Sequence, residues 1–245
     1  DDFVATAEVR RPPNNFFDLA LIESLATAFA QLDDDDRCRA IVLCSEGKHF
    51  CAGANFAASD SSTPAGSGRH LYDAAVDLFA TRTPVVAAVQ GAAIGGGLGL
   101  ACFADFRVAA PEARFSANFA RLGFHHGFGL TVTLPRLVGQ QHALDLLYTG
   151  RRIDGTAAVE FGLADELVEL DDLRSAAHER AADIAASAPL AVRSIRDTMR
   201  GGLADEIRAA TDHEQAEQDR LRTTADWREG VAAMAERRPP RFTNS

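Results

Sequence analysis

Two short apolar runs constrain this chain most strongly, because each has the length of one strand and neither has a polar face. The first run covers residues 40–44 and the second covers residues 85–89. Strands that are apolar at every position are typical of sheets covered on both faces. The second run leads into the glycine-rich segment 91–99 and then into an expected strand around residues 106–108. Strand, turn, helix and strand form a βαβ unit with a right-handed parallel crossover. The sequence therefore predicts an α/β fold.

Apolar residues at helical spacing predict helices around these strands. One helix is expected over residues 18–32 and another over residues 69–81. Nearly everything after Leu173 is expected to be helical, with breaks at Pro189 and at residues 201–202. The coarse organisation is therefore an α/β body followed by a helical tail.

We interpret residues 1–190 as one core domain and residues 191–245 as a C-terminal helical region. Residues 59–68 are rich in Ser, Gly, Thr and Pro, a composition typical of a linker. The four acidic residues 33–36 end the first helix, and we interpret them as a solvated turn.

Charge and hydropathy exclude several classes of partner. The formal net charge is -10, and a surface of that sign repels a phosphate backbone, so no nucleic-acid partner is expected. No stretch approaches the roughly 20 consecutive apolar residues of a membrane span, so no membrane partner is expected. Four irregularly spaced cysteines fit neither a zinc pattern nor a disulfide framework, and we expect reduced thiols in the core and no metal. The first residues lack the order of a secretory signal, which predicts a cytoplasmic protein.

The glycine run at residues 95–99 allows two interpretations. It lacks the Lys-Ser/Thr ending of a phosphate loop and the spacing of a dinucleotide fingerprint. Glycines at a helix N-terminus permit close approach to free N–H groups that favour a developing negative charge, which is half of an oxyanion hole. They are equally compatible with tight packing of a helix on a strand. A second donor is expected from the small-residue loop 51–55, and two such donors would polarise a thioester carbonyl and stabilise its enolate.

Together these segments resemble the enoyl-CoA hydratase/isomerase (crotonase) superfamily. The resemblance covers the strand and loop over residues 41–55 and the strand and glycine turn over residues 84–97. It continues through residues 134–139, 148–151 and 157–165, and so extends over nearly the whole chain.

The resemblance implies a crotonase-like spiral of ββα units, with a C-terminal helical region that mediates trimers, commonly paired as hexamers. It implies an acyl-CoA thioester as substrate and no cofactor besides the coenzyme A of that substrate. By position in the motifs, the backbone amides of Ala54 and Gly96 would be the oxyanion donors. Substrate contacts are expected near these donors and at the basic, aromatic tail; the residues are Ala52, Asn55, Gly95, Arg241 and Phe242. A solvated basic end is the competing interpretation of that tail.

Two departures from the family pattern bear on the reaction. Hydratases of this group carry one glutamate three residues after the middle glycine and a second in the loop after the next strand, and the pair activates and protonates water. This chain has Gly99 and Phe119 at those positions. Neither side chain moves a proton, so simple hydration is not expected. We expect Phe119 to make its side of the pocket drier, and Gly99 to leave room for a bulkier acyl group, an ordered water or an anion.

The replacement candidates are the adjacent His125 and His126, because an imidazole titrates near neutral pH. His126 is nearer the acidic position of the family, and we expect it to be the better candidate for facing the acyl pocket. The alternative is that both histidines only fix their loop by hydrogen bonding. Structural roles are expected for Asp105 and Arg107, as an ion pair, and for Tyr148, as a core residue.

Three functions stay open. The first is an acyl-CoA enzyme that stabilises an enolate at Ala54 and Gly96 and is of lyase or isomerase class. The second is a histidine-assisted isomerisation, hydrolysis or C–C cleavage of a bulkier acyl-CoA. The third is a non-catalytic acyl-CoA binding protein.

Overall fold

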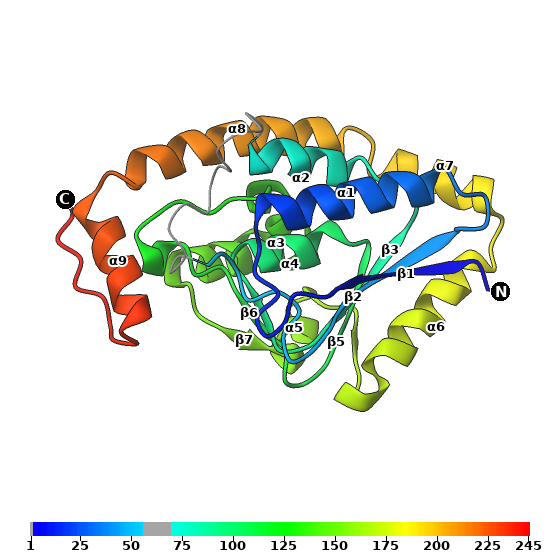
Figure 1. Cartoon of the computed structure of the whole chain (residues 1–245), viewed down its shortest axis with the longest axis horizontal. Coiled ribbons are helices and arrows are strands. Elements are labelled where there is room, and N and C mark those ends of the chain that lie inside the picture. The colour runs from blue at the N-terminus through cyan, green and yellow to red at the C-terminus, as the bar shows by residue number, and fades with distance from the viewer. Residues whose placement is uncertain (1, 56–69) are drawn as a thin grey trace.

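A computed structural model describes residues 2–55 and 70–245, and within these ranges the chain forms two sheets surrounded by helices (Figure 1). The larger sheet is parallel throughout, in the order β1-β2-β3-β5-β8. Its strands are β1 (Val4–Val9), β2 (Ala40–Ser45), β3 (Val85–Val89), β5 (Phe106–Ala109) and β8 (Glu166–Leu167). The predicted α/β class is confirmed. The predicted linker at residues 59–68 lies outside the described residues.

A smaller sheet carries the segments that the sequence analysis singled out. Its strands are β4 (Ala92–Ile94), β6 (Arg114–Ser116) and β7 (Ile153–Asp154). Strand β4 pairs with β6 in parallel, and β6 pairs with β7 antiparallel. An isolated parallel bridge joins Cys51 to Ala93, so the loop after β2 runs beside β4. This bridge brings the small-residue loop next to the glycine turn that follows β4.

Helices cover both faces of the larger sheet. They are α1 (Leu19–Asp33), α2 (Leu71–Phe79), α3 (Gly96–Phe103), α4 (Leu130–Thr149), α5 (Gly155–Glu160), α6 (Leu173–Ala185), α7 (Pro189–Met199), α8 (Leu203–Leu221) and α9 (Ala225–Ala235), with short 3-10 turns η1 (Ala120–Leu122) and η2 (Leu170–Asp172). The predicted helices and the breaks near Pro189 and residues 201–202 are confirmed. In the described part of the chain, none of the helices has both the length and the apolar character needed to cross a bilayer.

The apolar strand runs are explained by a core on each side of the sheet. Alternate side chains of one strand point to opposite faces. Ile41 and Leu43 join the core under α1, α2 and α3, whereas Val42 and Cys44 join the core under α6. Figure 1 shows α6 on the face opposite α1 and α2. All four cysteines are free and buried, as predicted.

Two expectations about single residues are wrong. Asp33 is not a solvated turn residue, because its buried carboxylate accepts hydrogen bonds of 2.8 Å from the backbone N–H groups of Arg82 and Thr83. It thereby ties the end of α1 to the segment before β3. Tyr148 is not a core residue, since it is 74% exposed near the end of α4.

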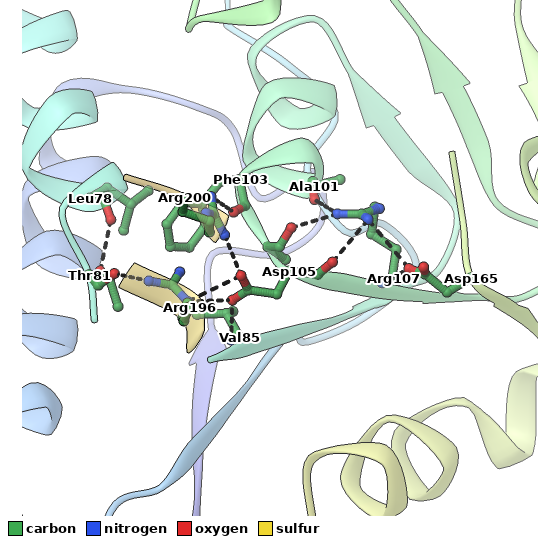
Figure 2. A network of polar contacts seen from close by, with 11 residues as sticks. Leu78, Thr81, Val85, Ala101, Phe103, Asp105, Arg107, Asp165, Arg196 and Arg200 are labelled. Carbon is green, nitrogen blue, oxygen red and sulfur yellow. Dashed lines mark hydrogen bonds and ion pairs between the residues drawn. The ribbon is translucent and has the colours of Figure 1, made fainter. Parts of the chain in front are cut away.

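The predicted ion pair between Asp105 and Arg107 is also wrong, and Figure 2 shows what replaces it. The Asp105 carboxylate lies 2.6 Å from Arg200, which ends α7, and 3.1 Å from Arg196 within that helix. Burial raises the pKa of Asp105, but the two guanidinium groups outweigh it and hold the pKa below its usual range. Arg107 instead pairs with Asp165 at 3.3 Å and donates to buried backbone carbonyls. The network fastens α7 to the start of β5.

Candidate active site

A cavity lies where the small-residue loop, the glycine turn and the helices α2, α8 and α9 meet. It encloses about 110 Å³, enough for several water molecules or part of a small ligand. Its wall includes Ala52, Gly53 and Ala54 from the loop and Gly95 and Gly96 from the turn. The two segments that the sequence analysis paired therefore line one cavity.

Backbone pairing holds the small-residue loop in place. The Cys51 N–H donates to the Ala92 carbonyl at 2.8 Å, and the Ile94 N–H donates to the Cys51 carbonyl at 3.0 Å. The Ala52 N–H donates to the Asn14 carbonyl at 3.0 Å, so this amide is already engaged. The loop is thus fixed on both sides before it reaches Ala54.

The glycine turn packs against the small-residue loop and also lines the cavity. A β-carbon on Gly97 would overlap the carbonyl oxygen of Cys51, which makes a side chain there incompatible with the loop. Gly95 has φ +56°, in the left-handed region that glycine tolerates best, and its N–H donates to the Ser116 carbonyl at 2.8 Å. Gly96 then begins α3. The packing interpretation therefore applies to Gly97, and the oxyanion interpretation of Gly96 stays a prediction.

Ala54 and Gly96, whose amides are the predicted oxyanion donors, both line the cavity. Among the described residues, neither N–H donates to a backbone carbonyl. Gly96 is the first residue of α3, and the N–H groups of a first helical turn have no partner within the helix. Two amides that line one cavity without a backbone acceptor are suited to an oxygen atom that gains negative charge.

Phe119 lines the cavity, whereas Gly99 does not, and the expectation of free room at Gly99 is wrong. A β-carbon on Gly99 would lie 2.7 Å from Cδ1 of Phe128, so the Phe128 ring fills that space. Phe128 is 1% exposed and packs edge-on against Phe17 at 4.9 Å between ring centroids. Its φ is +61°, an unfavourable value for an aromatic residue, so packing must hold it there. Aromatic rings thus replace both glutamates of the family pattern.

His125 and His126 lie outside the cavity wall, so the expectation that one of them faces the acyl pocket receives no support. The His126 ring is 6.5 Å from the Phe119 ring between centroids, and its Nε2 is 2.8 Å from the Thr131 hydroxyl. The two imidazoles stack at 4.1 Å between centroids. Burial, with His125 and His213 nearby, lowers the pKa of His126 to about 4, so its ring is neutral at pH 7. A part for either histidine in proton transfer stays a prediction.

The buried carboxylate of Glu214 lies close to His126. Glu214 of α8 accepts from the Gly129 N–H at 2.8 Å and from the Thr131 N–H at 3.1 Å. These are free amides of the first turn of α4, so Glu214 caps that helix from another element. The Glu214 carboxylate lies 3.9 Å from Nε2 of His126. Glu214, close to His126, therefore stabilises the start of α4.

The remaining predicted contacts lie away from the described cavity wall. The Arg241 N–H donates to Glu229 of α9 at 2.6 Å, and Phe242 is 44% exposed. Asn55 is half-buried and is the last residue described before the gap. None of Asn55, Arg241 and Phe242 is among the described residues that line the cavity, and their contacts with coenzyme A stay predictions.

Polar residues that the sequence analysis did not select complete the wall. They are His70 and Tyr72 from the α2 end, Asn118 before η1, and Gln218 and Arg222 from the α8 end. Nothing in the local sequence marks them, because they come together only through the packing of α2 against α8, visible in Figure 1. Among the described residues, no group of three or more His, Cys, Asp or Glu side chains is placed to hold a metal ion.

Known proteins match this chain, some of them along nearly its whole length. The family model described as enoyl-CoA hydratase/isomerase matches residues 2–245. A probable enoyl-CoA hydratase of Mycobacterium bovis is 32% identical over 246 residues, which cover 100% of this chain and 96% of the relative. A probable enoyl-CoA hydratase of Mycobacterium tuberculosis is 40% identical over 183 residues, which cover 72% of this chain and 69% of the relative.

Solved structures agree with these sequence matches. An enoyl-CoA hydratase/isomerase from Pseudoalteromonas atlantica superposes with a TM-score of 0.90 at 30% identity, over 99% of this chain and 97% of the other. A carnitinyl-CoA dehydratase from Mycobacterium avium superposes with a TM-score of 0.85 at 29% identity, over 99% of this chain and 96% of the other. The predicted spiral α/β fold of this family is thereby confirmed.

Proposed function

Because the chain belongs to the enoyl-CoA hydratase/isomerase family, we propose that it is an acyl-CoA enzyme that stabilises a thioester enolate. The Ala54 and Gly96 amides receive the thioester oxygen, and the cavity beyond them receives the acyl group. One observation carries the proposal: both residues line a single cavity, and neither N–H donates to a backbone carbonyl among the described residues. Fixed amides in a site shielded from water stabilise an enolate more than the neutral thioester, which lowers the barrier to its formation.

The reaction that follows enolate formation is proposed to be other than simple hydration. Hydration needs a group that activates water, and no Asp or Glu side chain lines the cavity in the described part of the chain. Phe119 and Phe128 occupy the wall instead, and a dry aromatic wall disfavours a positioned nucleophilic water. Isomerisation or C–C cleavage of an acyl-CoA needs no such water and fits this wall better than hydration or hydrolysis, with His126 as the candidate proton carrier behind Phe119.

A non-catalytic acyl-CoA binding protein is the second candidate function. The observation that favours it is that the described wall holds neither His125 nor His126, and that Nδ1 of His70, the one imidazole there, is engaged in the cap of α2. The free amides favour the enzyme instead, because passive binding has no need for donors aimed at a developing oxyanion.

Exchange of deuterium into the α-carbon of a bound acyl-CoA separates the two functions. An enzyme that stabilises the enolate should exchange the α-proton of butyryl-CoA in D₂O faster than free butyryl-CoA does. Binding of butyryl-CoA without enhanced exchange would support the passive binder. Absence of binding to any acyl-CoA would overturn both proposals.

We also propose that the chain assembles as a homotrimer or hexamer. Three large apolar side chains on α7 support this proposal, since Leu190 is 79% exposed, Ile195 63% and Met199 79%. Burial of a contiguous apolar surface is the main favourable contribution to subunit association.

A further inference from the structure

The cavity of the proposed acyl-CoA site has a polar region formed between α2 and α8. His70 caps the N-terminus of α2, and Tyr72 follows two residues later. Gln218 lies in the last turns of α8, and Arg222 is the residue that ends it. All four line the cavity. The rest of its wall is largely apolar, including Phe17, Leu122, Phe124 and Met234. The cavity therefore offers one polar region to a ligand that is otherwise held by apolar contacts.

Arg222 gives this region its charge. It is the only Lys or Arg side chain among the described residues of the wall, and no Asp or Glu joins it there. Its guanidinium makes no salt bridge with any residue in the described ranges. Its Nε is buried and has no hydrogen-bond partner among those residues. Buried donors almost always have a partner, and an unmade bond to a charged group is costly. Arg39, Arg180 and Arg196 each have such an atom too, but among these four only Arg222 lines the cavity, where a ligand could supply the acceptor.

The neighbours of Arg222 present donors as well. Nδ1 of His70 accepts from the Tyr72 N–H at 3.2 Å, which leaves Nε2–H as a donor when the ring is neutral. Burial lowers the pKa of His70 and raises that of Tyr72, so the imidazole is neutral and the phenol keeps its proton. The Gln218 amide donates to the His125 carbonyl at 3.0 Å, which fixes its orientation.

Three acidic side chains near this region lie outside the described cavity wall. Asp73 accepts from the His70 N–H at 3.2 Å as part of the α2 cap, and Glu214 caps α4. Asp219 of α8 is exposed and acts on His70 through its charge. None of the three is part of the described cavity wall. The charge of Arg222 therefore stays available within the cavity.

We propose that the acyl group of the substrate carries a carboxylate, which Arg222 binds at the polar region while the thioester lies at Ala54 and Gly96. This inference rests on the proposed function, because it assigns the acyl half of the same cavity. A planar guanidinium matches a carboxylate with two parallel N–H···O bonds and satisfies the buried Nε. The substrate class is thus a CoA monothioester of a dicarboxylic acid.

Calorimetric titration with matched pairs of saturated acyl-CoAs tests this assignment. Each pair has one chain length, and its members end in a carboxylate or in a methyl group. The expected result is tighter binding of the carboxylate member at one or more chain lengths. Arg222→Gln should weaken that member about 10- to 100-fold and leave the methyl-ended member within about threefold. Arg220→Gln is the matched control, because Arg220 lies on the same helix, is exposed and pairs with Glu217. It should leave both members unchanged.

The outcomes separate this inference from the proposed function. Binding of methyl-ended acyl-CoAs with no carboxylate preference at any length would overturn the inference and leave the enolate site standing. Failure of every acyl-CoA to bind the wild-type protein would overturn the proposed function itself. Equal weakening of both members by Arg222→Gln would show that Arg222 has only a structural role, and would also overturn the inference. A methyl ester of the preferred substrate that binds as well as the free carboxylate would show recognition of a neutral acceptor and would also overturn the inference. Thermal unfolding of each variant checks that it is folded.

Discussion

The Phe128 ring stands over Gly99, so that a β-carbon on Gly99 would lie 2.7 Å from Cδ1 of Phe128 and 3.0 Å from its Cβ. A glutamate at the Gly99 position would have to displace this ring to reach the cavity. The lack of a glutamate at position 99 and the presence of the Phe128 ring are therefore linked, because both side chains would need the same space. A chain that regains the carboxylate without losing the ring should not regain a hydratase site.

Gly99→Ala should lower the free energy of unfolding by about 1–3 kcal/mol, because overpacking in a filled core is destabilising. Phe128→Leu should lower it as well, through lost packing. The double variant should be less destabilised than the sum of the two, since the smaller side chain admits the new methyl group. Denaturant unfolding of the four proteins measures this coupling. Strict additivity would mean that the ring does not occupy the space above Gly99.

Gly96→Pro should lower the rate of α-proton exchange by about 10²- to 10³-fold beyond the effect of Gly96→Ala, because only proline removes the amide donor. The alanine variant is needed because any β-carbon at Gly96 would lie 2.7 Å from the Phe17 ring. Proline is otherwise tolerated at the first position of a helix. Exchange of butyryl-CoA in D₂O gives the rates. Equal rates for the two variants would exclude the Gly96 amide as an oxyanion donor.

The protein should lose stability between about pH 6.5 and pH 4 because of His126. A folded-state pKa of about 4 lies below the value of a free imidazole, so the unfolded chain binds more protons in this range. Stability contributed by the neutral ring is therefore complete above pH 6.5 and lost as the pH falls. Glu214, 3.9 Å away, favours the charged ring and reduces the effect, whereas His125 and His213 strengthen it. The expected loss is about 1–3 kcal/mol.

His126→Gln provides the comparison for this pH dependence. Its unfolding free energy should fall less steeply over the same interval, because glutamine does not titrate. Denaturant unfolding at a series of pH values measures both proteins, and the ring signals of His126 in proton NMR give its pKa directly. Parallel curves for the two proteins would place the acid sensitivity at another residue.

Asp105→Asn should lower the free energy of unfolding by about 3–5 kcal/mol, because it leaves Arg196 and Arg200 without their counter-charge at a largely buried position. Glu206→Gln is the control, since Glu206 pairs with Arg136 where both side chains are about half exposed. That control should cost less than about 1 kcal/mol. Chemical unfolding compares the two. Similar losses would show that the contacts in Figure 2 do not anchor α7.

Ile195→Asp should reduce the mass of the assembly in solution. A charge on the exposed apolar face of α7 would have to be buried without a partner in a subunit contact. Light scattering after size-exclusion chromatography reports the mass of wild type and variant. A wild-type monomer at micromolar concentration would contradict the proposed trimer or hexamer.

Sequence patterns were sufficient for the elements that carry the amides. The apolar runs predicted β2 and β3, and the glycine run predicted the turn into α3, because period and backbone conformation are local properties. The small-residue loop was expected from its own pattern to supply a second donor, and the family likeness then pointed to Ala54 and Gly96 in particular.

The rest of the site depends on contacts that local sequence does not encode. Phe128 closes the space at Gly99 from a loop almost thirty positions away. Arg222 reaches the cavity only because α8 packs on α2. Asp105 and Arg107 are two positions apart but have different partners, because distant segments bring Arg196 to Asp105 and Asp165 to Arg107. Each of these features requires the three-dimensional packing of distant segments.

The wall of the cavity is assembled from residues as far apart in the chain as Phe17 and Met234. A ribosome releases these residues in order, so the amide pair emerges long before α8 and α9 can close over it. Until then the wall of the site is incomplete. A ligand that needs the whole wall can therefore stabilise the finished protein but cannot guide the first stages of its folding.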